Sequence, residues 1–277
     1  MVFITAEIGI NHNGSLKITK QLIDMAVEAG CDAVKFQART VENIYSKEIL
    51  DSKRDSPWGT TTREQKNGLE LSEKDYKIID KYCKKKKIDW FLSCWDIDSQ
   101  IRMRKFKTKY NKIASAMLTH TKLLHKVAEE EKHTFISTGM STMKDITKAV
   151  KIFRSYKCPF ELMHSHSAYP MELKEANIRV IQTLQKKFKC NIGYSGHETG
   201  SYLIPIIATT LGASSIERHI TLSRAMYGSD QAASLGPKGL WAMVQDIRAI
   251  EKILGDGTKR IWESEKPSMK KLRERLS

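Results

Sequence analysis

The chain lacks the features that mark membrane, secreted and disulfide-rich proteins. None of its apolar runs approaches the roughly 20 residues that a membrane span needs. Its first residues, Met-Val-Phe-Ile-Thr-Ala-Glu, carry no basic segment and reach an acid within the first apolar run, unlike a signal peptide. The five cysteines are scattered singly, which indicates reduced thiols. We therefore expect a cytoplasmic protein that makes no use of a membrane.

Several enzyme motifs are also missing, and nucleic acid is not an expected partner. The sequence has no Walker loop, no Rossmann fingerprint and no Gly-x-Ser-x-Gly elbow. Its net charge of +15 would suit nucleic acid, anionic lipid or a small anionic substrate. However, the densest run of lysines, 84–87, ends a predicted helix, where cations suit the helix dipole. No nucleic-acid-binding motif accompanies it, so most of the charge is assigned to solvated helix faces.

Short apolar strands alternate with amphipathic helices along the chain. Strands are predicted at 3–8, 32–37, 88–94, 110–115, 133–138, 160–165, 191–195 and 213–218. Helices are predicted at 15–30, 72–87, 97–106, 119–131, 142–156, 173–188, 199–211 and 237–254. Eight β/α units predict an α/β fold of one domain, a closed (β/α)₈ TIM barrel, because a doubly wound sheet would leave two units unused.

The predicted barrel spans residues 1–266 and carries one large insertion. A polar stretch between the second strand and the next helix, near 38–71, is too long for a plain connection and predicts a functional insertion. Residues 267–277 form a basic C-terminal tail.

Polar residues gather at the carboxyl ends of all eight predicted strands, where barrel enzymes place their chemistry. These residues are Glu7; Lys35 and Gln37; Ser93 and Cys94; Lys112 and Ser115; Ser137 and Thr138; His164, Ser165 and Ser167; Ser195 and His197; and Glu217, Arg218 and His219. The pattern predicts an active site at this rim.

Lys35 and Lys112 are candidates for binding an anion. Each is flanked by apolar residues, and a lysine that points into a barrel mouth is costly unless it meets a negative charge. Together with serines from several strands, they would suit a phosphate and a carboxylate. The alternative is that each lysine points outward with its ammonium group in water.

Candidates for metal binding and proton transfer complete the rim. His197 and His219 come from adjacent strands at matching depth, and neutral imidazoles suit Mn²⁺, Fe²⁺ or Zn²⁺, although hydrogen-bonded core roles are the alternative. Glu7 lies in an otherwise apolar strand, which favours a functional carboxylate. Asp230 could orient a sugar hydroxyl or accept a proton, or could simply cap a turn.

Gly193 and Gly196, which bracket Ser195, would allow the backbone to approach a ligand closely.

Seven segments in register resemble the sialic acid (N-acetylneuraminate) synthase family. They are EIGINHNG (7–14), VKFQ (34–37), ISTGM (136–140), SAYP (167–170), IGYSGHETG (192–200), IERHIT (216–221) and GSDQAASL (228–235). The resemblance runs in order from about residue 3 to residue 266.

The resemblance implies condensation of phosphoenolpyruvate with an N-acetylated amino sugar to a nine-carbon 2-keto acid and phosphate. It implies that His197 and His219 hold Mn²⁺ or Mg²⁺, with catalytic roles for Glu7, Asp230 and His219. The side chains that it places on phosphoenolpyruvate are Lys35, Lys112, Ser115, Ser137, Ser167 and Ser195, and those that it places in the sugar site are Gln37 and Tyr169. It further implies a homodimer.

Three departures from the family pattern leave the acceptor open. Met117 stands where many members have an acid that contacts the sugar, and Cys94 stands where members often have Thr or Ser. The antifreeze-like domain that often follows the barrel, and supplies a sugar-binding Arg, is not in the sequence, so a separate protein could complete the site. The acceptor is therefore N-acetylmannosamine or a diacetamido sugar. The alternatives are another phosphoenolpyruvate-dependent 2-keto sugar acid synthase and a non-catalytic sugar-binding relative.

Overall fold

A closed parallel barrel forms the centre of the protein. The computed structural model describes residues 1–199 and 202–273. The strands of the barrel are β1 (Phe3–Gly9), β2 (Ala33–Ala38), β5 (Asp89–Cys94), β6 (Asn111–Ile113), β7 (Thr134–Ser137), β8 (Phe160–Ser165), β9 (Ile192–Gly196) and β10 (Ser215–His219). Around the barrel they follow the order β1-β10-β9-β8-β7-β6-β5-β2, so that the first strand pairs with the last. The (β/α)₈ barrel predicted from the sequence is thereby confirmed.

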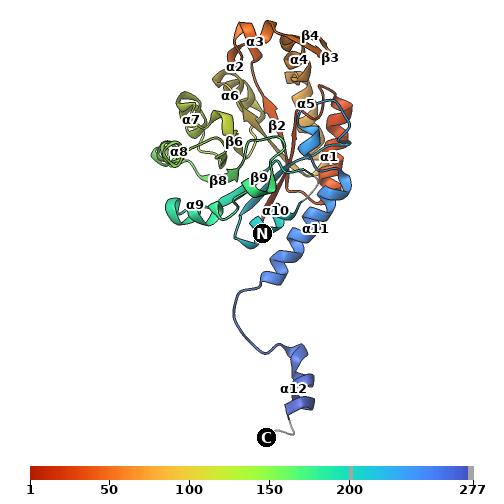
Figure 1. Ribbon diagram of the computed structural model, residues 1–277, viewed down its shortest axis with the longest axis vertical. Coiled ribbons are helices and arrows are strands. Elements are labelled where there is room, and N and C mark those ends of the chain that lie inside the picture. The colour runs from red at the N-terminus through yellow and green to blue at the C-terminus, as the bar shows by residue number, and fades with distance from the viewer. Residues whose placement is uncertain (200–201, 274–277) are drawn as a thin grey trace.

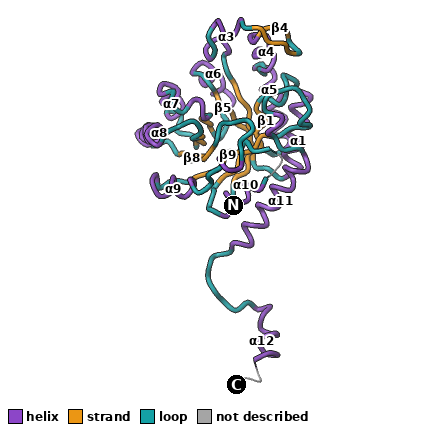
Figure 2. The backbone as a smooth tube through the Cα atoms, in the orientation of Figure 1, coloured by secondary structure: helices purple, strands orange, loops and turns teal. Residues whose placement is uncertain are grey.

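Helices surround the strands on the outside, as Figure 2 shows. They are α1 (Leu16–Ala29), α5 (Glu73–Lys86), α6 (Ile97–Met103), α7 (Thr121–Ala128), α8 (Met143–Ser155), α9 (Val180–Phe188), α10 (Leu203–Thr210) and α11 (Pro237–Leu254). Local sequence fixes their ends. Ser15 accepts a hydrogen bond from the Ile18 amide at the start of α1, and Gly30 ends it with φ of 87°.

Two predicted helices differ from the structure. The predicted helix 173–188 is a 3₁₀ turn, η3 (Leu173–Glu175), followed by a loop and then α9 from Val180. The loop is fixed by tertiary contacts, since the Ala176 carbonyl receives a hydrogen bond of 2.7 Å from His164 Nε2. The predicted helix 199–211 begins at Leu203 as α10, and positions 200–201 of that prediction lie outside the described residues.

Side chains point alternately to the two faces of each strand, which gives one core between the strands and helices and another inside the barrel. In β5, Trp90, Leu92 and Cys94 pack among the residues between the strands and helices. Phe91 faces the interior, where it stacks on Phe135 with ring centroids 5.6 Å apart. Side chains such as these fill the barrel near the amino ends of its strands. The apolar plug leaves the carboxyl ends free to carry the polar groups.

The insertion after β2 packs over the barrel rim beside the β10–α11 loop. It contains α2 (Val41–Ile44), α3 (Lys47–Asp51), the hairpin β3 (Lys53–Ser56) and β4 (Gly59–Thr61), and α4 (Thr62–Leu69). The Trp58 ring meets the Tyr227 ring edge-on at 5.5 Å, and Gln65 Nε2 donates to the Tyr227 hydroxyl at 3.1 Å. Through Tyr227, the insertion therefore supports the loop that carries Asp230.

Beyond α11 the chain extends away from the barrel, as the blue segment in Figure 1 shows. It ends in α12 (Lys266–Arg273), and residues 274–277 of the predicted tail lie outside the described residues. Ile261 and Trp262 in this segment are exposed. Within residues 1–199 and 202–273, no helix is long and apolar enough to cross a membrane.

Candidate active site

A polar cavity of about 140 Å³ opens at the carboxyl ends of the barrel strands. It is lined by Glu7, Lys35, Gln37, Ser93, Trp95, Lys112, Ala114, Ser115, Ala116, Ser137, Met140, Ser165, Ser167, Tyr169, Ser195, His197, Glu217 and His219. Every residue assigned a catalytic, substrate-binding or metal-binding role from the sequence lines this cavity except Asp230, which lies beside His219. Four members of the wider strand-end set do not line it: Cys94, Thr138, His164 and Arg218. The structure therefore brings the predicted residues together at the rim where barrel strands present their chemistry.

Two lysines and one glutamate form a buried charged cluster in the cavity. Glu217 of β10 lies between Lys35 of β2 and Lys112 of β6, with each Nζ 2.9 Å from a carboxylate oxygen. These strands are not neighbours in the barrel, so their side chains can meet only inside it. The alternative in which the lysines point outward is excluded for this structure.

Burial and mutual attraction set the protonation of this cluster. Burial alone would raise the pKa of Glu217, but Lys112 and Lys35 outweigh it and hold that pKa well below its ordinary value. Burial would lower the pKa of Lys35, but Glu217 and Glu7 reverse the shift and raise it. At Lys112 burial prevails, and the pKa is lowered. The cluster therefore contains a firmly charged carboxylate and one lysine that loses its proton more readily.

Glu7 lies next to the cluster, and its carboxyl group is easily protonated. Its Oε1 accepts a hydrogen bond of 2.9 Å from Gln37 Nε2, and its Oε2 lies 3.5 Å from Lys35 Nζ. Burial raises the pKa of Glu7, and Lys35 only partly opposes this effect. A carboxyl group of this kind can both hold and release a proton near neutral pH.

Serine hydroxyls from four strand ends face the same space. Ser115 accepts a hydrogen bond of 3.2 Å from the Gly139 amide, and a Cβ at Gly139 would collide with the hydroxyls of Ser115 and Ser167. Ser195 donates to Glu217 at 3.0 Å, and Ser137 also lines the cavity. Hydroxyls beside two lysines are suited to the oxygens of a phosphate or carboxylate.

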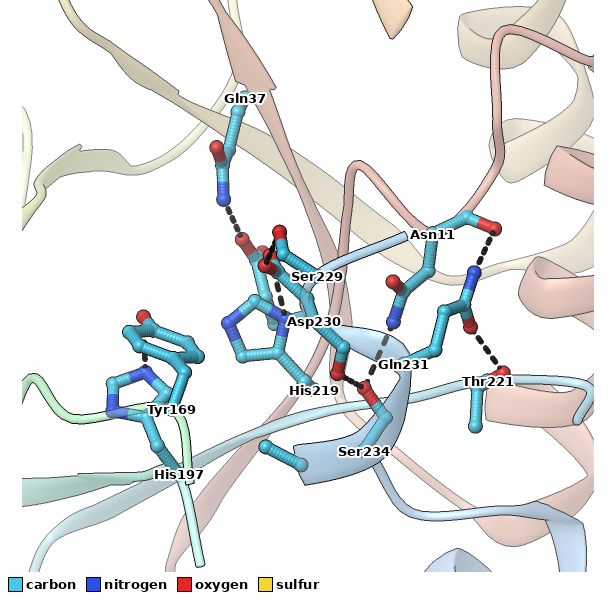
Figure 3. A network of polar contacts seen from close by, with 12 residues as sticks. Asn11, Gln37, Tyr169, His197, His219, Thr221, Ser229, Asp230, Gln231 and Ser234 are labelled. Carbon is cyan, nitrogen blue, oxygen red and sulfur yellow. Dashed lines mark hydrogen bonds and ion pairs between the residues drawn. The ribbon is translucent and has the colours of Figure 1, made fainter. Parts of the chain in front are cut away.

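Two imidazoles and a phenol also line the site, and Figure 3 shows them close together. The rings of His197 and His219 are 5.5 Å apart, and the Tyr169 hydroxyl lies 2.7 Å from His197 Nε2. Burial lowers the pKa of each histidine to about 3, with repulsion from His219 adding to the effect at His197 and from Lys35 at His219. Both rings are therefore neutral, as metal ligands must be.

Asp230 reaches the site from the loop before η4 (Gln231–Ala233). Its Oδ2 lies 3.8 Å from His219 Nδ1, an atom with no hydrogen-bond partner among the described residues. The loop is held by Ser234, which donates to the Asp230 carbonyl at 2.6 Å and receives a hydrogen bond from Asn11 at 2.8 Å. Figure 3 shows these contacts to the right of His219. The carboxylate is thus fixed next to the imidazole pair.

The two histidines fit a metal that takes part of its coordination shell from other molecules. No group of three or more His, Cys, Asp and Glu side chains suited to a metal occurs among residues 1–199 and 202–273. The two neutral imidazoles, with the unpartnered Nδ1 of His219, are the donors that this cavity offers. A divalent ion here would have positions open to water and substrate.

The structure places four residues singled out from the sequence outside the cavity lining: Cys94, Met117, Gly193 and Gly196. Cys94 packs on the helical side of β5, and its neighbour Ser93 faces the cavity, so the cysteine removes no hydroxyl from the cavity. Met117 packs against the outer core, whereas Ala116 lines the cavity. At Gly193, a Cβ would collide with Ser215, so that glycine makes room for protein rather than ligand.

Gly196, like Gly193, makes room for neighbouring protein side chains. A Cβ at this position would collide with the side chains of Glu198 and Tyr194. Glu198 is in turn the buried partner of Arg218 on β10. The glycine therefore serves packing behind the strand, not access for a ligand.

Two positions in the candidate site received no role from the sequence. Glu217 lies in the middle of β10, two residues before His219, and this spacing could have placed both side chains on the inner face. Trp95 follows β5, and no pattern in the sequence distinguishes it from a core tryptophan. The structure places Glu217 at the centre of the charged cluster and Trp95 in the cavity lining.

Comparisons with known proteins point to one family. Residues 22–259 match the model of the NeuB family. The human N-acetylneuraminate-9-phosphate synthase is 36% identical over 98% of this chain and 76% of that protein. The N,N'-diacetyllegionaminic acid synthase of Legionella pneumophila is 33% identical over 96% of this chain and 76% of that protein.

A solved structure supports the same relationship. The N-acetylneuraminic acid (sialic acid) synthetase of Leptospira borgpetersenii serovar Hardjo-bovis, crystallised in complex with citrate, superposes with a TM-score of 0.86. It is 32% identical, and the match covers 99% of this chain and 93% of that one. The fold and the sequence thus identify the same relatives.

Proposed function

Because the chain belongs to the NeuB family, we propose that it condenses phosphoenolpyruvate with an N-acetylated amino sugar to a nine-carbon 2-keto sugar acid. The observation that supports this most is a single cavity in which two lysines and several serines face two neutral imidazoles. One half suits an anion with two charged groups, and the other half suits a metal and a sugar.

Phosphoenolpyruvate binds in the lysine half of the cavity. Lys35 and Lys112 bind its charged oxygens, and the hydroxyls of Ser115, Ser137, Ser167 and Ser195 donate further hydrogen bonds. When the substrate is absent, the Glu217 carboxylate accepts hydrogen bonds from both lysines and keeps their ammonium groups in the cavity. The substrate therefore enters an anion site that is already formed.

The reaction joins two carbon atoms and releases phosphate. The C3 methylene of phosphoenolpyruvate bonds to the aldehyde carbon of the open-chain sugar, and the aldehyde oxygen takes up a proton. A water molecule adds to C2 and loses one proton. The C2–O bond to phosphate then breaks, and the new hydroxyl gives its remaining proton to the departing phosphate and becomes the keto oxygen. Glu7 and Asp230 hold and accept the protons and position the sugar and the water, while Gln37 and Tyr169 line the sugar site.

His197 and His219 would hold a divalent metal ion, Mn²⁺ or Mg²⁺. When bound, the ion supplies a Lewis acid for the sugar aldehyde. His197 Nδ1 lies 2.6 Å from the His166 carbonyl, which orients the ring, so Nε2, which pairs with the Tyr169 hydroxyl in this structure, is the nitrogen that would bind the metal.

An assay of phosphate release tests the proposal. Phosphoenolpyruvate, Mn²⁺ and one acceptor would be incubated with the protein, and the acceptors would be N-acetylmannosamine, its phosphate ester, a diacetamido sugar and non-acetylated aldose phosphates. We expect phosphate release only with the acetamido sugars. Turnover confined to non-acetylated aldose phosphates would instead favour another 2-keto sugar acid synthase, and turnover with none of them a non-catalytic relative.

The Lys112→Ala variant tests the anion site. Because a hydrogen bond from a charged group contributes about 1.5–3 kcal/mol, we expect the KM for phosphoenolpyruvate to rise about 10- to 100-fold. The KM for the sugar should change little. Lys109→Ala removes an exposed lysine that pairs with Asp89 on the outside of the barrel and is the matched control. An unchanged KM for phosphoenolpyruvate in Lys112→Ala would count against the anion site.

A further inference from the structure

One buried donor in the cavity has no partner. The Nε1–H group of Trp95 is buried, and within residues 1–199 and 202–273 it meets no acceptor. Three other unpartnered polar atoms, Glu7 Oε2, Ser165 Oγ and His219 Nδ1, belong to residues that line the same cavity. An unpaired buried donor costs about 1–3 kcal/mol, so a set of such atoms around one space indicates a ligand that satisfies them.

The indole ring is held in a fixed orientation. The Trp95 amide donates to the Ala38 carbonyl at 3.0 Å, and the Arg39 guanidinium lies over the ring at 4.7 Å. Arg39 is itself fixed, because Nε lies 2.7 Å from Glu70 and an Nη atom donates to Gln37 at 2.7 Å. A donor held in this way loses little conformational entropy when a ligand accepts its hydrogen bond.

Trp95 belongs to the outer part of the cavity. The side chains of Lys35 and Lys112 are 5% and 1% exposed, whereas Tyr169 and Met140 are 46% and 70% exposed. Trp95 is half-buried, between these extremes. A cavity of about 140 Å³ is smaller than the roughly 300 Å³ at which ligand pockets begin, so the second substrate must extend into the mouth.

Trp95 lies near Gln37, which the proposed function places in the sugar site. The strands next to β5 bring Gln37 and Ser115 as well as Ala114 and Ala116 to the cavity. Arg39, which lies over the Trp95 ring, donates to Gln37 Oε1 at 2.7 Å. The charged oxygens of phosphoenolpyruvate already have two lysines and several serines, so an uncharged donor beside Gln37 suits an uncharged oxygen of the other substrate.

We infer that Trp95 Nε1–H donates a hydrogen bond to a hydroxyl or amide oxygen of the acceptor sugar, which makes Trp95 a specificity-determining residue. This inference rests on the proposed function. Arg39 acts through Trp95 and Gln37 and is a positioning residue.

The Trp95→Phe variant tests this contact, because it keeps an aromatic ring under Arg39 and removes the N–H donor with the smaller ring of the indole. We expect the KM for the sugar to rise about 3- to 10-fold, the value of one neutral hydrogen bond, with the KM for phosphoenolpyruvate within about 2-fold of the wild type. Trp262→Phe makes the same change at a tryptophan that is 61% exposed in the C-terminal segment and should leave both constants unchanged. Equal thermal midpoints for Trp95→Phe and wild type would show that the fold is intact.

The outcomes separate this inference from the proposed function. Wild-type turnover combined with an unchanged sugar KM in Trp95→Phe, or a rise confined to phosphoenolpyruvate, overturns the inference alone. Absence of wild-type turnover with every acetamido sugar overturns the proposed function. In that case the indole ¹H–¹⁵N resonance of Trp95, identified as the one missing from Trp95→Phe, is followed while N-acetylmannosamine is added. A saturable shift supports the contact, and no shift overturns it.

Discussion

Replacement of His219 by alanine should lower turnover by about 10³-fold or more. A Lewis acid contributes several kcal/mol to a reaction of this class, and each 1.4 kcal/mol is a factor of ten in rate. His219 is one of two neutral imidazoles in the cavity, so its loss would leave His197 as the single imidazole donor there. The measurements are phosphate release and, independently, Mn²⁺ affinity from the electron paramagnetic resonance signal of the free ion.

A matched control comes from His164. Its ring is also buried, but its Nε2 bonds to the Ala176 carbonyl on the helical side of β8. His164→Ala should therefore lower stability while retaining Mn²⁺ affinity and activity. Retained Mn²⁺ affinity and activity in His219→Ala would show that this histidine is not a metal ligand.

Replacement of Glu217 by glutamine should lower the free energy of unfolding by about 3–5 kcal/mol. The substitution preserves shape but removes the charge that lies 2.9 Å from both Lys35 and Lys112. Two buried lysines would then face one another, with Glu7 beside Lys35 and the partly neutralised Glu161 near Lys112 as the acids left close by. Urea denaturation of the ligand-free protein measures the change.

The decrease in the free energy of unfolding of Glu217→Gln should also depend on pH. In the variant, burial without Glu217 lowers the lysine pKa values below those of the unfolded chain, so the folded form binds fewer protons than the unfolded form. Stability must then rise as the pH rises through the lowered pKa values. The loss measured at pH 6 should therefore exceed the loss measured at pH 9.

Glu161 provides the control for this substitution. It is equally buried in β8, but burial raises its pKa and its partner is the Ser215 hydroxyl rather than a lysine. Glu161→Gln should therefore cost about 1 kcal/mol or less, because a neutral side chain replaces one that is already inclined to be neutral. Equal losses in the two variants would contradict the assignment of the ion-pair cluster.

The barrel could be predicted because its strands are specified by local patterns. The strand residues that face the helices are mostly apolar, and the helices have polar faces and identifiable ends, such as Ser15 and Gly30 for α1. The prediction of a helix in the segment before α9 is wrong for a physical reason. Its composition favours a helix, but the His164 contact to Ala176 and the bridge between Met171 and Glu198 hold it as a loop. Tertiary contacts of this kind are invisible in local sequence.

The candidate site was predictable only in part, because it depends on which side chains from distant strands come into contact. The sequence placed Lys35 and Lys112 at one rim but could not show that Glu217, on a distant strand, lies between them. It also could not tell which face of β5 carries Cys94, since neighbouring residues on a strand point in opposite directions. Trp95 was missed because an unpaired donor is a property of its surroundings and not of its residue type.

The charged cluster has a consequence for the order in which the barrel folds. Glu217 is 182 residues beyond Lys35 and 105 residues beyond Lys112, on the strand that closes the barrel against β1. Any shorter intermediate that buried the two lysines would do so without their carboxylate, at a cost of several kcal/mol. Glu7 of β1 can offset only part of this cost, since it lies 3.5 Å from Lys35 alone. Partly formed barrels are thus penalised until β10 arrives, so the same contact that holds the anion site in place favours cooperative closure of the barrel.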